Sequence, residues 1–188
     1  MLQYLPNALT FSRLILAVPL GLLILSEDYH WALGIGFIAG VTDALDGFFA
    51  RRLGAFSRFG AAMDPIADKV LVTVSFLCMA QVQLIPWYLA TLVIARDLII
   101  VAGALCYHWL IGPFEFAAST LSKINMGIQI GFCVLVLTAQ VITQIPPLTI
   151  TIGMAMVLFI AASSGFDYVA SWTIKAIDVR RQKGNNGD

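Results

Sequence analysis

Six long apolar stretches, separated by short polar connections, constrain the fold of this chain more than any other feature. Each approaches the roughly 20 residues that an α-helix needs to cross the hydrocarbon core of a membrane. Only 12% of the residues are charged, whereas soluble domains carry about a quarter. The sequence therefore predicts an all-α, polytopic membrane protein, a bundle of six transmembrane helices. The expected helices are Ala8–Leu25, Trp31–Leu53, Met63–Val82, Pro86–Trp109, Ser122–Val141 and Leu148–Trp172.

Basic residues mark alternate connections between these stretches. Lys and Arg flank the connections after the second and fourth stretches and follow the sixth, while the other three connections contain none. Because basic loops stay on the cytoplasmic side, both termini are expected there, in a bacterial inner membrane. We expect one transmembrane domain over residues 1–174 and a polar tail over 175–188 that frays. The formal net charge is zero, so the charge balance does not point to nucleic acid.

Two pairs of carboxylates interrupt the apolar pattern of the second and third stretches. Asp43 and Asp46 are three residues apart and Asp64 and Asp68 four apart, so each pair lies on one face of one helix. Four buried acids are costly in a membrane without cations. Carboxylates without His or Cys are hard oxygen ligands, suited to Mg²⁺, Mn²⁺ or Ca²⁺. The pairs therefore predict a divalent metal site between two helices, near the cytoplasmic side.

Small residues and an arginine accompany the acids. Gly47, Ala50 and Gly60 leave room beside the carboxylates, and Arg51 adds a cation. Metal ions, an arginine and small residues together are typical of a phosphate or diphosphate site. Two other interpretations remain: the acids form ion pairs with Lys69 and other nearby basic residues, or they line a cation or proton transport path. The basic cluster, which would repel a travelling cation, argues against transport.

The same run of residues resembles the signature of the CDP-alcohol phosphatidyltransferase family, D-x2-D-G-x2-A-R-x8-G-x3-D-x3-D. Every fixed position and every spacing is matched, and the resemblance extends over nearly the whole chain. The early segment PNALTFSR, with Asn7, Thr10 and Arg13, is also similar to the family. The matched signature positions are Asp43, Asp46, Gly47, Ala50, Arg51, Gly60, Asp64 and Asp68.

The resemblance implies an enzyme of phospholipid biosynthesis that transfers a phosphatidyl group from CDP-diacylglycerol to an alcohol and releases CMP. It implies two Mg²⁺ or Mn²⁺ ions held by the four aspartates, with Asp68 as general base, as ligand, or as both. Gly47, Ala50, Arg51 and Gly60 would bind the CDP and diphosphate portion. The resemblance also implies a homodimer.

Two acceptors remain open: phosphatidylglycerol, which gives cardiolipin, and glycerol 3-phosphate, which gives phosphatidylglycerophosphate. Arg96 lies near the middle of the fourth stretch and should face the bundle interior. Enzymes that use glycerol 3-phosphate resemble this segment, but carry Glu after the arginine and a second arginine eight positions beyond it. Here Asp97 and Ala104 occupy those positions. This departure favours phosphatidylglycerol.

A polar stripe opens the fifth stretch. Ser122, Lys123, Asn125 and Gln129 match the S-K-x-N-T-x2-Q segment of the cardiolipin-forming branch, with Met126 in place of Thr. A polar face within a membrane must meet a cavity or another helix, so interhelical hydrogen bonding is the competing interpretation. We expect acceptor binding by Arg96, Lys123 and Asn125, although Arg96 could instead pair with a buried acid.

Overall fold

The computed structural model is all-helical, as the apolar stretches predict. It describes the backbone of residues 5–53, 58–110, 120–142 and 144–185, and the side chains of residues 14–42, 69–103, 124–142 and 144–166. The described backbone contains helices and no strand. The helices are α1 (Leu5–Leu25), α2 (Tyr29–Leu53), α3 (Arg58–Gln81), α4 (Trp87–Leu110), α5 (Thr120–Val141) and α6 (Pro147–Asn185).

Each helix coincides with one predicted stretch, and the largest difference lies at the C-terminus. The segment from residue 175, expected to fray, is helical through Asn185. It contains Ala, Arg, Gln and Lys, which favour helix, and no Gly before Gly184. At 39 residues, α6 is about 58 Å long at 1.5 Å per residue, roughly twice the thickness of a hydrocarbon core.

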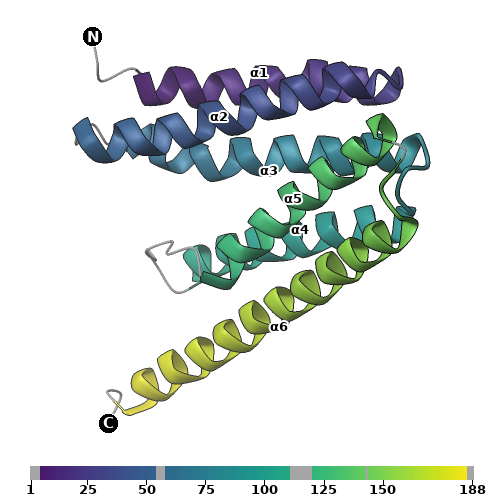
Figure 1. The fold of residues 1–188 in the computed structure, drawn as a ribbon. Coiled ribbons are helices and arrows are strands. Elements are labelled where there is room, and N and C mark those ends of the chain that lie inside the picture. Colours follow the sequence, from purple (N-terminus) through teal and green to yellow (C-terminus); the bar gives the residue numbers. More distant parts are fainter. Residues whose placement is uncertain (1–4, 54–57, 111–119, 143, 186–188) are drawn as a thin grey trace.

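The helices form two connected groups (Figure 1). In one group α1 contacts both α2 and α3, and in the other α6 contacts both α4 and α5. Contacts of α3 with α4 and α5, and of α2 with α5, join the groups. The connections α1–α2, α3–α4 and α5–α6 lie at one end of the bundle, which we call the turn end. The start of α1 and the end of α6 lie at the opposite end.

Two turns at the turn end share one backbone geometry. Glu27, after α1, and Gln83, after α3, have φ of 62° and 60°. In the first turn the Asp28 amide donates to the Leu23 carbonyl, and in the second the Leu84 amide donates to the Met79 carbonyl, at 2.9 Å each. These are Schellman caps, which satisfy the last carbonyls of a helix. Both use a residue other than glycine in the left-handed region, at a cost of about 1 kcal/mol each.

The core next to the turn end is apolar. Phe76 and Phe132 join α3 to α5 with ring centroids 6.1 Å apart, an arrangement that adds to the energy of burial. The helix faces that meet here are almost fully buried, and we call this set the apolar layer. Its members are Ile24, Phe76, Met79, Leu89, Val93, Phe132, Val136 and Val157.

Glycines permit close packing at two helix contacts. A Cβ atom on Gly21 would lie 2.8 Å from Cγ1 of Val74, so α1 and α3 approach too closely for a larger residue. A Cβ atom on Gly153 would lie 2.9 Å from the Phe132 ring. The two glycines therefore set the α1–α3 and α5–α6 distances at the level of the apolar layer.

The outer surface of the bundle is also apolar. Phe37, Phe159 and Phe166 are each more than 70% exposed, and large exposed apolar surface indicates contact with lipid or protein. Within the described part of the chain, two segments are long and apolar enough to cross a membrane, Ile124–Val141 and Pro147–Phe166.

Candidate functional site

Charged, amide and hydroxyl side chains, buried or partly buried, occupy the helix faces beyond the apolar layer. We call this set the polar layer: Lys69, Arg96, Asp97, Asn125, Gln129 and Ser164. On four helices a polar-layer residue stands seven positions from an apolar-layer residue, and the direction is always away from the turn end. Seven residues make about two turns, so both residues share one helix face and lie about 10 Å apart along it. The pairs are Lys69 and Phe76 on α3, Leu89 and Arg96 on α4, Gln129 and Val136 on α5, and Val157 and Ser164 on α6.

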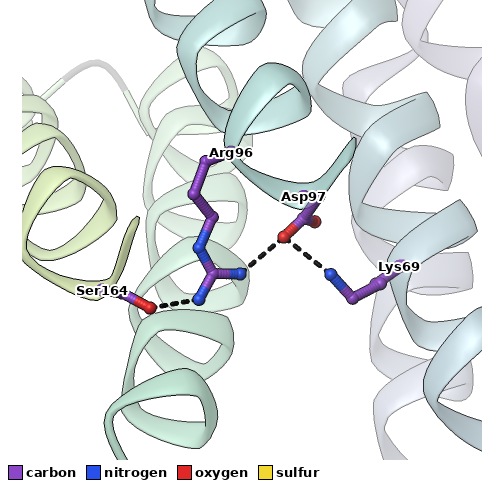
Figure 2. A network of polar contacts seen from close by, with 4 residues as sticks. All are labelled: Lys69, Arg96, Asp97 and Ser164. Atoms are coloured by element: carbon purple, nitrogen blue, oxygen red, sulfur yellow. Dashed lines mark hydrogen bonds and ion pairs between the residues drawn. The ribbon is translucent and has the colours of Figure 1, made fainter. Parts of the chain in front are cut away.

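Arg96 and Asp97 form the centre of the polar layer (Figure 2). The Asp97 Oδ1 atom accepts from Nη1 of Arg96 at 2.6 Å and pairs with Nζ of Lys69 at 2.7 Å. Nη2 of Arg96 donates to the Ser164 hydroxyl. One carboxylate oxygen thus lies between two cations, and the network links α3, α4 and α6.

The burial of this network makes its electrostatics strong. Arg96 is 6% exposed and Ser164 is fully buried, while the Asp97 and Lys69 side chains are 14% and 30% exposed. A buried guanidinium is costly without a hydrogen-bonded partner, and Asp97 provides one here. The arginine predicted to face the interior does so, and it pairs with an acid, which was the competing interpretation. Two cations against one carboxylate leave these three side chains with one net positive charge.

The contacts that Asp97 and Ser164 make with Arg96 do not follow from the sequence. Asp97 follows Arg96 directly, and adjacent residues on a helix do not normally face each other. Ser164 lies 68 positions from Arg96, so only the packing of α6 on α4 brings them together. The sequence offers Lys69 as a partner for the metal-site acids, whereas its partner in this network is Asp97. The sequence signal for Ser164 is a serine within an apolar helix, in a chain that also carries an arginine, Arg96, within another apolar helix.

The amide side chains of α5 are buried and incompletely bonded. Asn125 is 1% and Gln129 2% exposed. The Asn125 Oδ1 atom and the Gln129 Nε2 atom make no hydrogen bond, although buried polar atoms almost always have a partner. These atoms do not make the interhelical hydrogen bonds of the competing interpretation. They leave one acceptor and one donor for a ligand or water. The predicted neighbours Ser122 and Lys123 lie outside the described side chains.

The four signature aspartates fall on the helices that the motif predicts. Asp43 and Asp46 lie on α2, and Asp64 and Asp68 on α3; their side chains lie outside the described residues. Both helices contact α1 and are antiparallel, so the end of α2 and the start of α3 lie at the same end of the bundle (Figure 1). Asp46 lies seven residues before the end of α2, and Asp64 lies six residues after the start of α3.

The second acid of each helix is also at a matched height. Asp43 and Asp68 are both ten residues from the ends of their helices at the α2–α3 connection, which is about 15 Å along each axis. Four aspartates at corresponding positions along the two helices are a donor set whose chemistry fits hard divalent cations. Gly47, Ala50 and Arg51 on α2 and Gly60 on α3 lie outside the described side chains. Asp68 immediately precedes Lys69, so the acid helix runs directly into the polar layer.

Fold and site together define an all-helical bundle whose apolar helices enclose a charged layer. The family model for CDP-alcohol phosphatidyltransferases matches residues 3–174. The chain belongs to the CDP-alcohol phosphatidyltransferase family, which confirms the family predicted from the signature.

Named relatives fall into two groups. The chain is 34% identical to the cardiolipin synthase (CMP-forming) of Rattus norvegicus and 32% identical to that of Homo sapiens, over 87% of its length in both cases. It spans 59% and 60% of the length of those two proteins. It is also 32% identical to the CDP-diacylglycerol–glycerol-3-phosphate 3-phosphatidyltransferase of Bacillus subtilis (strain 168), over 67% of this chain and 72% of that protein.

Proposed function

We propose that this protein transfers the phosphatidyl group of CDP-diacylglycerol to phosphatidylglycerol, forming cardiolipin and CMP. The observation that carries the proposal is the complete eight-position signature on α2 and α3, with its acids at matched heights, in a member of this family. The relatives named cardiolipin synthase support the choice of product.

The donor half of the site would consist of the signature residues. Asp43, Asp46, Asp64 and Asp68 would hold two Mg²⁺ or Mn²⁺ ions, because an all-carboxylate donor set suits hard cations. Bound ions would neutralise the diphosphate and stabilise the charge that develops during phosphoryl transfer. The small residues Gly47, Ala50 and Gly60 would let the cytidine nucleotide lie close to the helix backbones, with Arg51 beside the diphosphate.

The reaction requires one side chain of this protein to accept a proton. Asp68 would take the proton of the acceptor hydroxyl, because a carboxylate within hydrogen-bond reach can act as general base. The acceptor oxygen then bonds to the phosphorus that carries diacylglycerol. The bond from that phosphorus to the bridging diphosphate oxygen breaks, and CMP leaves with the electron pair. Fixed cations such as Arg51 act by positioning and by charge stabilisation.

The acceptor half would lie in the polar layer. Arg96 would bind the acceptor phosphate, since hydrogen bonds from a guanidinium to a phosphate are charge-assisted and roughly twice as strong as neutral ones. Lys123 and Asn125 would complete this subsite from α5. The unbonded Asn125 Oδ1 and Gln129 Nε2 atoms support it, because neutral amides suit the hydroxyls of a glycerol group.

Glycerol 3-phosphate is the second candidate acceptor. The Bacillus subtilis relative is named for that acceptor and has the same 32% identity to this chain as the human protein, over 67% of the chain instead of 87%. Both acceptors present a glycerol hydroxyl and a phosphate. They differ in charge, since one is a phosphodiester and the other a phosphomonoester, and in the two acyl chains of phosphatidylglycerol.

The bundle would sit in a membrane with the six helices as spans, residues 1–174 as its transmembrane domain and both termini in the cytoplasm. Exposed apolar side chains on α2 and α6 support contact with lipid, and the placement of basic residues supports this orientation. The acids would face the cytoplasm, in a bacterial inner membrane, where CDP can reach them while the acyl chains stay in lipid. We also expect a homodimer.

Product identification tests this proposal. Purified protein would receive CDP-diacylglycerol and Mg²⁺ or Mn²⁺, with phosphatidylglycerol or glycerol 3-phosphate offered separately, and the lipid product would be determined by mass spectrometry. Cardiolipin is the expected product. Product with glycerol 3-phosphate alone would exclude the favoured acceptor, and no CMP with either would exclude the transferase activity.

A further inference from the structure

Two side-chain atoms on α5, one acceptor and one donor, are buried without a hydrogen bond. They are Oδ1 of Asn125 and Nε2 of Gln129, on residues that are 1% and 2% exposed. The two residues are four positions apart, so they are neighbours on one helix face, with Cβ atoms about 5 to 6 Å apart. Because a buried polar group without a partner is costly, the pair points to a ligand that supplies both missing partners.

A hydroxyl group is the complement of this pair. It donates one hydrogen bond and accepts up to two, so one hydroxyl can donate to Oδ1 of Asn125 and accept from Nε2 of Gln129. An ionised phosphate has no proton to donate and would leave the asparagine oxygen unpaired. An ammonium group has no lone pair and would leave the glutamine nitrogen unpaired.

The pair lies at a matching position to the acids of α3. Phe132 of α5 meets Phe76 of α3 with ring centroids 6.1 Å apart, and both helices end at the turn end (Figure 1). Asn125 lies seven residues before Phe132, and Asp68 lies eight before Phe76. These separations are about 11 and 12 Å along the two helices. Since α5 contacts both α2 and α3, the amide pair stands on a helix that packs against both acid helices.

The proposed reaction decides which acceptor hydroxyl can meet the pair. A glycerol group offers a primary hydroxyl, which reacts, and a secondary hydroxyl on the next carbon. The reacting hydroxyl gives its proton to Asp68, so it cannot also donate that proton to Asn125. The secondary hydroxyl keeps its proton throughout and can bond to both amides.

We propose that Gln129 and Asn125 together bind the secondary, non-reacting hydroxyl of the acceptor. The inference rests on the proposed function and deepens it, because it adds Gln129 to the acceptor subsite and defines the substrate class. The acceptor must carry a hydroxyl on the carbon next to the reacting one, so simple alcohols are poor acceptors. Phosphatidylglycerol and glycerol 3-phosphate both meet this requirement.

Removing the secondary hydroxyl from the acceptor tests this inference. Phosphatidyl-1,3-propanediol is phosphatidylglycerol without that hydroxyl, and 3-hydroxypropyl phosphate is the corresponding analogue of glycerol 3-phosphate. Each analogue would be compared with its parent by CMP release from CDP-diacylglycerol with Mg²⁺ or Mn²⁺. In wild-type protein the kcat/KM of the analogue should be lower by about a hundredfold or more, because the analogue leaves two buried polar atoms unpaired.

A matched pair of variants assigns the effect to Gln129. Gln129→Met removes the donor and should reduce the preference for the parent acceptor about tenfold; parent and analogue are measured on one preparation, so the folded fraction cancels. The melting temperature should not fall, because Nε2 makes no hydrogen bond that the substitution could break. Gln140→Met replaces an exposed glutamine of the same helix and should leave the preference unchanged.

The outcomes distinguish this inference from the proposed function. If wild-type protein uses parent and analogue equally well, water alone meets the amides, and the inference is overturned while the function stands. The inference is also overturned if Gln129→Met keeps the wild-type preference or lowers only the melting temperature. Product with glycerol 3-phosphate alone would exclude the favoured acceptor, and the ratio for 3-hydroxypropyl phosphate would then decide the inference. No CMP with any acceptor would overturn both.

Discussion

At the turn end the helices meet through apolar faces such as Phe76 and Leu89, which are fully buried. Seven residues along the same two faces stand Lys69 and Arg96, joined through one carboxylate. The first region consists of apolar side chains, which pack against each other and carry no polar group that needs a partner. The second holds three charged side chains and two amide atoms without hydrogen bonds. A bundle of this kind is stabilised at one end and can place charged and incompletely bonded groups at the other, where a ligand can compensate them.

The largest effect that separates the two ends is expected at Asp68. Asp68→Asn should lower CMP release by about a thousandfold, because general-base catalysis contributes up to that order. Binding of CDP-diacylglycerol should largely persist, as measured by equilibrium binding of a labelled donor in the presence of Mg²⁺. Loss of all donor binding would favour the ligand role of Asp68 over the base role. Asp28→Asn is the matched control and should behave as wild type.

The apolar layer should carry stability instead of activity. Phe76→Ala removes a fully buried ring and should lower the free energy of unfolding by about 3 kcal/mol, as is typical of such cavities. Thermal unfolding in detergent measures this loss. Phe37→Ala, at a 73% exposed position, is the control and should change stability little. A Phe76→Ala protein of wild-type stability would contradict the assignment of the apolar layer as the core.

In contrast, Arg96 should contribute more to activity than to stability. Arg96→Ala should raise the KM for the acceptor by about tenfold to a hundredfold, the value of a charged hydrogen bond, and leave the KM for CDP-diacylglycerol unchanged. Initial rates of CMP release at varied acceptor and donor concentrations give both constants. An unchanged acceptor KM combined with a lower melting temperature would make Arg96 a purely structural residue.

The smallest effect is expected in the turns. Gln83→Gly should raise the free energy of unfolding by about 0.5 to 1 kcal/mol, because glycine adopts the left-handed region without strain. Glu27→Gly should do the same in the matching turn, while Gln81→Gly, in the last turn of α3, should destabilise. Thermal unfolding of the three variants is the measurement. A loss of stability in Gln83→Gly would show that its side chain matters more than its backbone.

The sequence predicts the helices and the acidic motif well for a physical reason. A run of about 20 apolar residues is a local property, and the signature is contiguous, so spacing alone places Asp43 with Asp46 and Asp64 with Asp68. The helical continuation of α6 to Asn185 differs from the expectation of a fraying tail, because the polar segment contains no helix breaker before Gly184.

The polar layer was less accessible from the sequence. Its bonds join adjacent residues, Arg96 and Asp97, or residues far apart, Arg96 and Ser164. The first kind depends on side-chain conformation and the second on how α4 and α6 pack, and neither follows from helical spacing. The burial of Arg96 was predictable, since a charge within an apolar helix must face the interior.

Metal dependence of CMP release tests the central claim most directly, because the claim assigns the carboxylates of α2 and α3 to divalent cations. Purified wild-type protein with CDP-diacylglycerol and phosphatidylglycerol would be assayed for CMP in EDTA and after addition of Mg²⁺ or Mn²⁺, with Asp64→Asn alongside. The account predicts no CMP in EDTA, recovery with added metal, and little recovery in Asp64→Asn. Equal release of CMP with and without metal would contradict it.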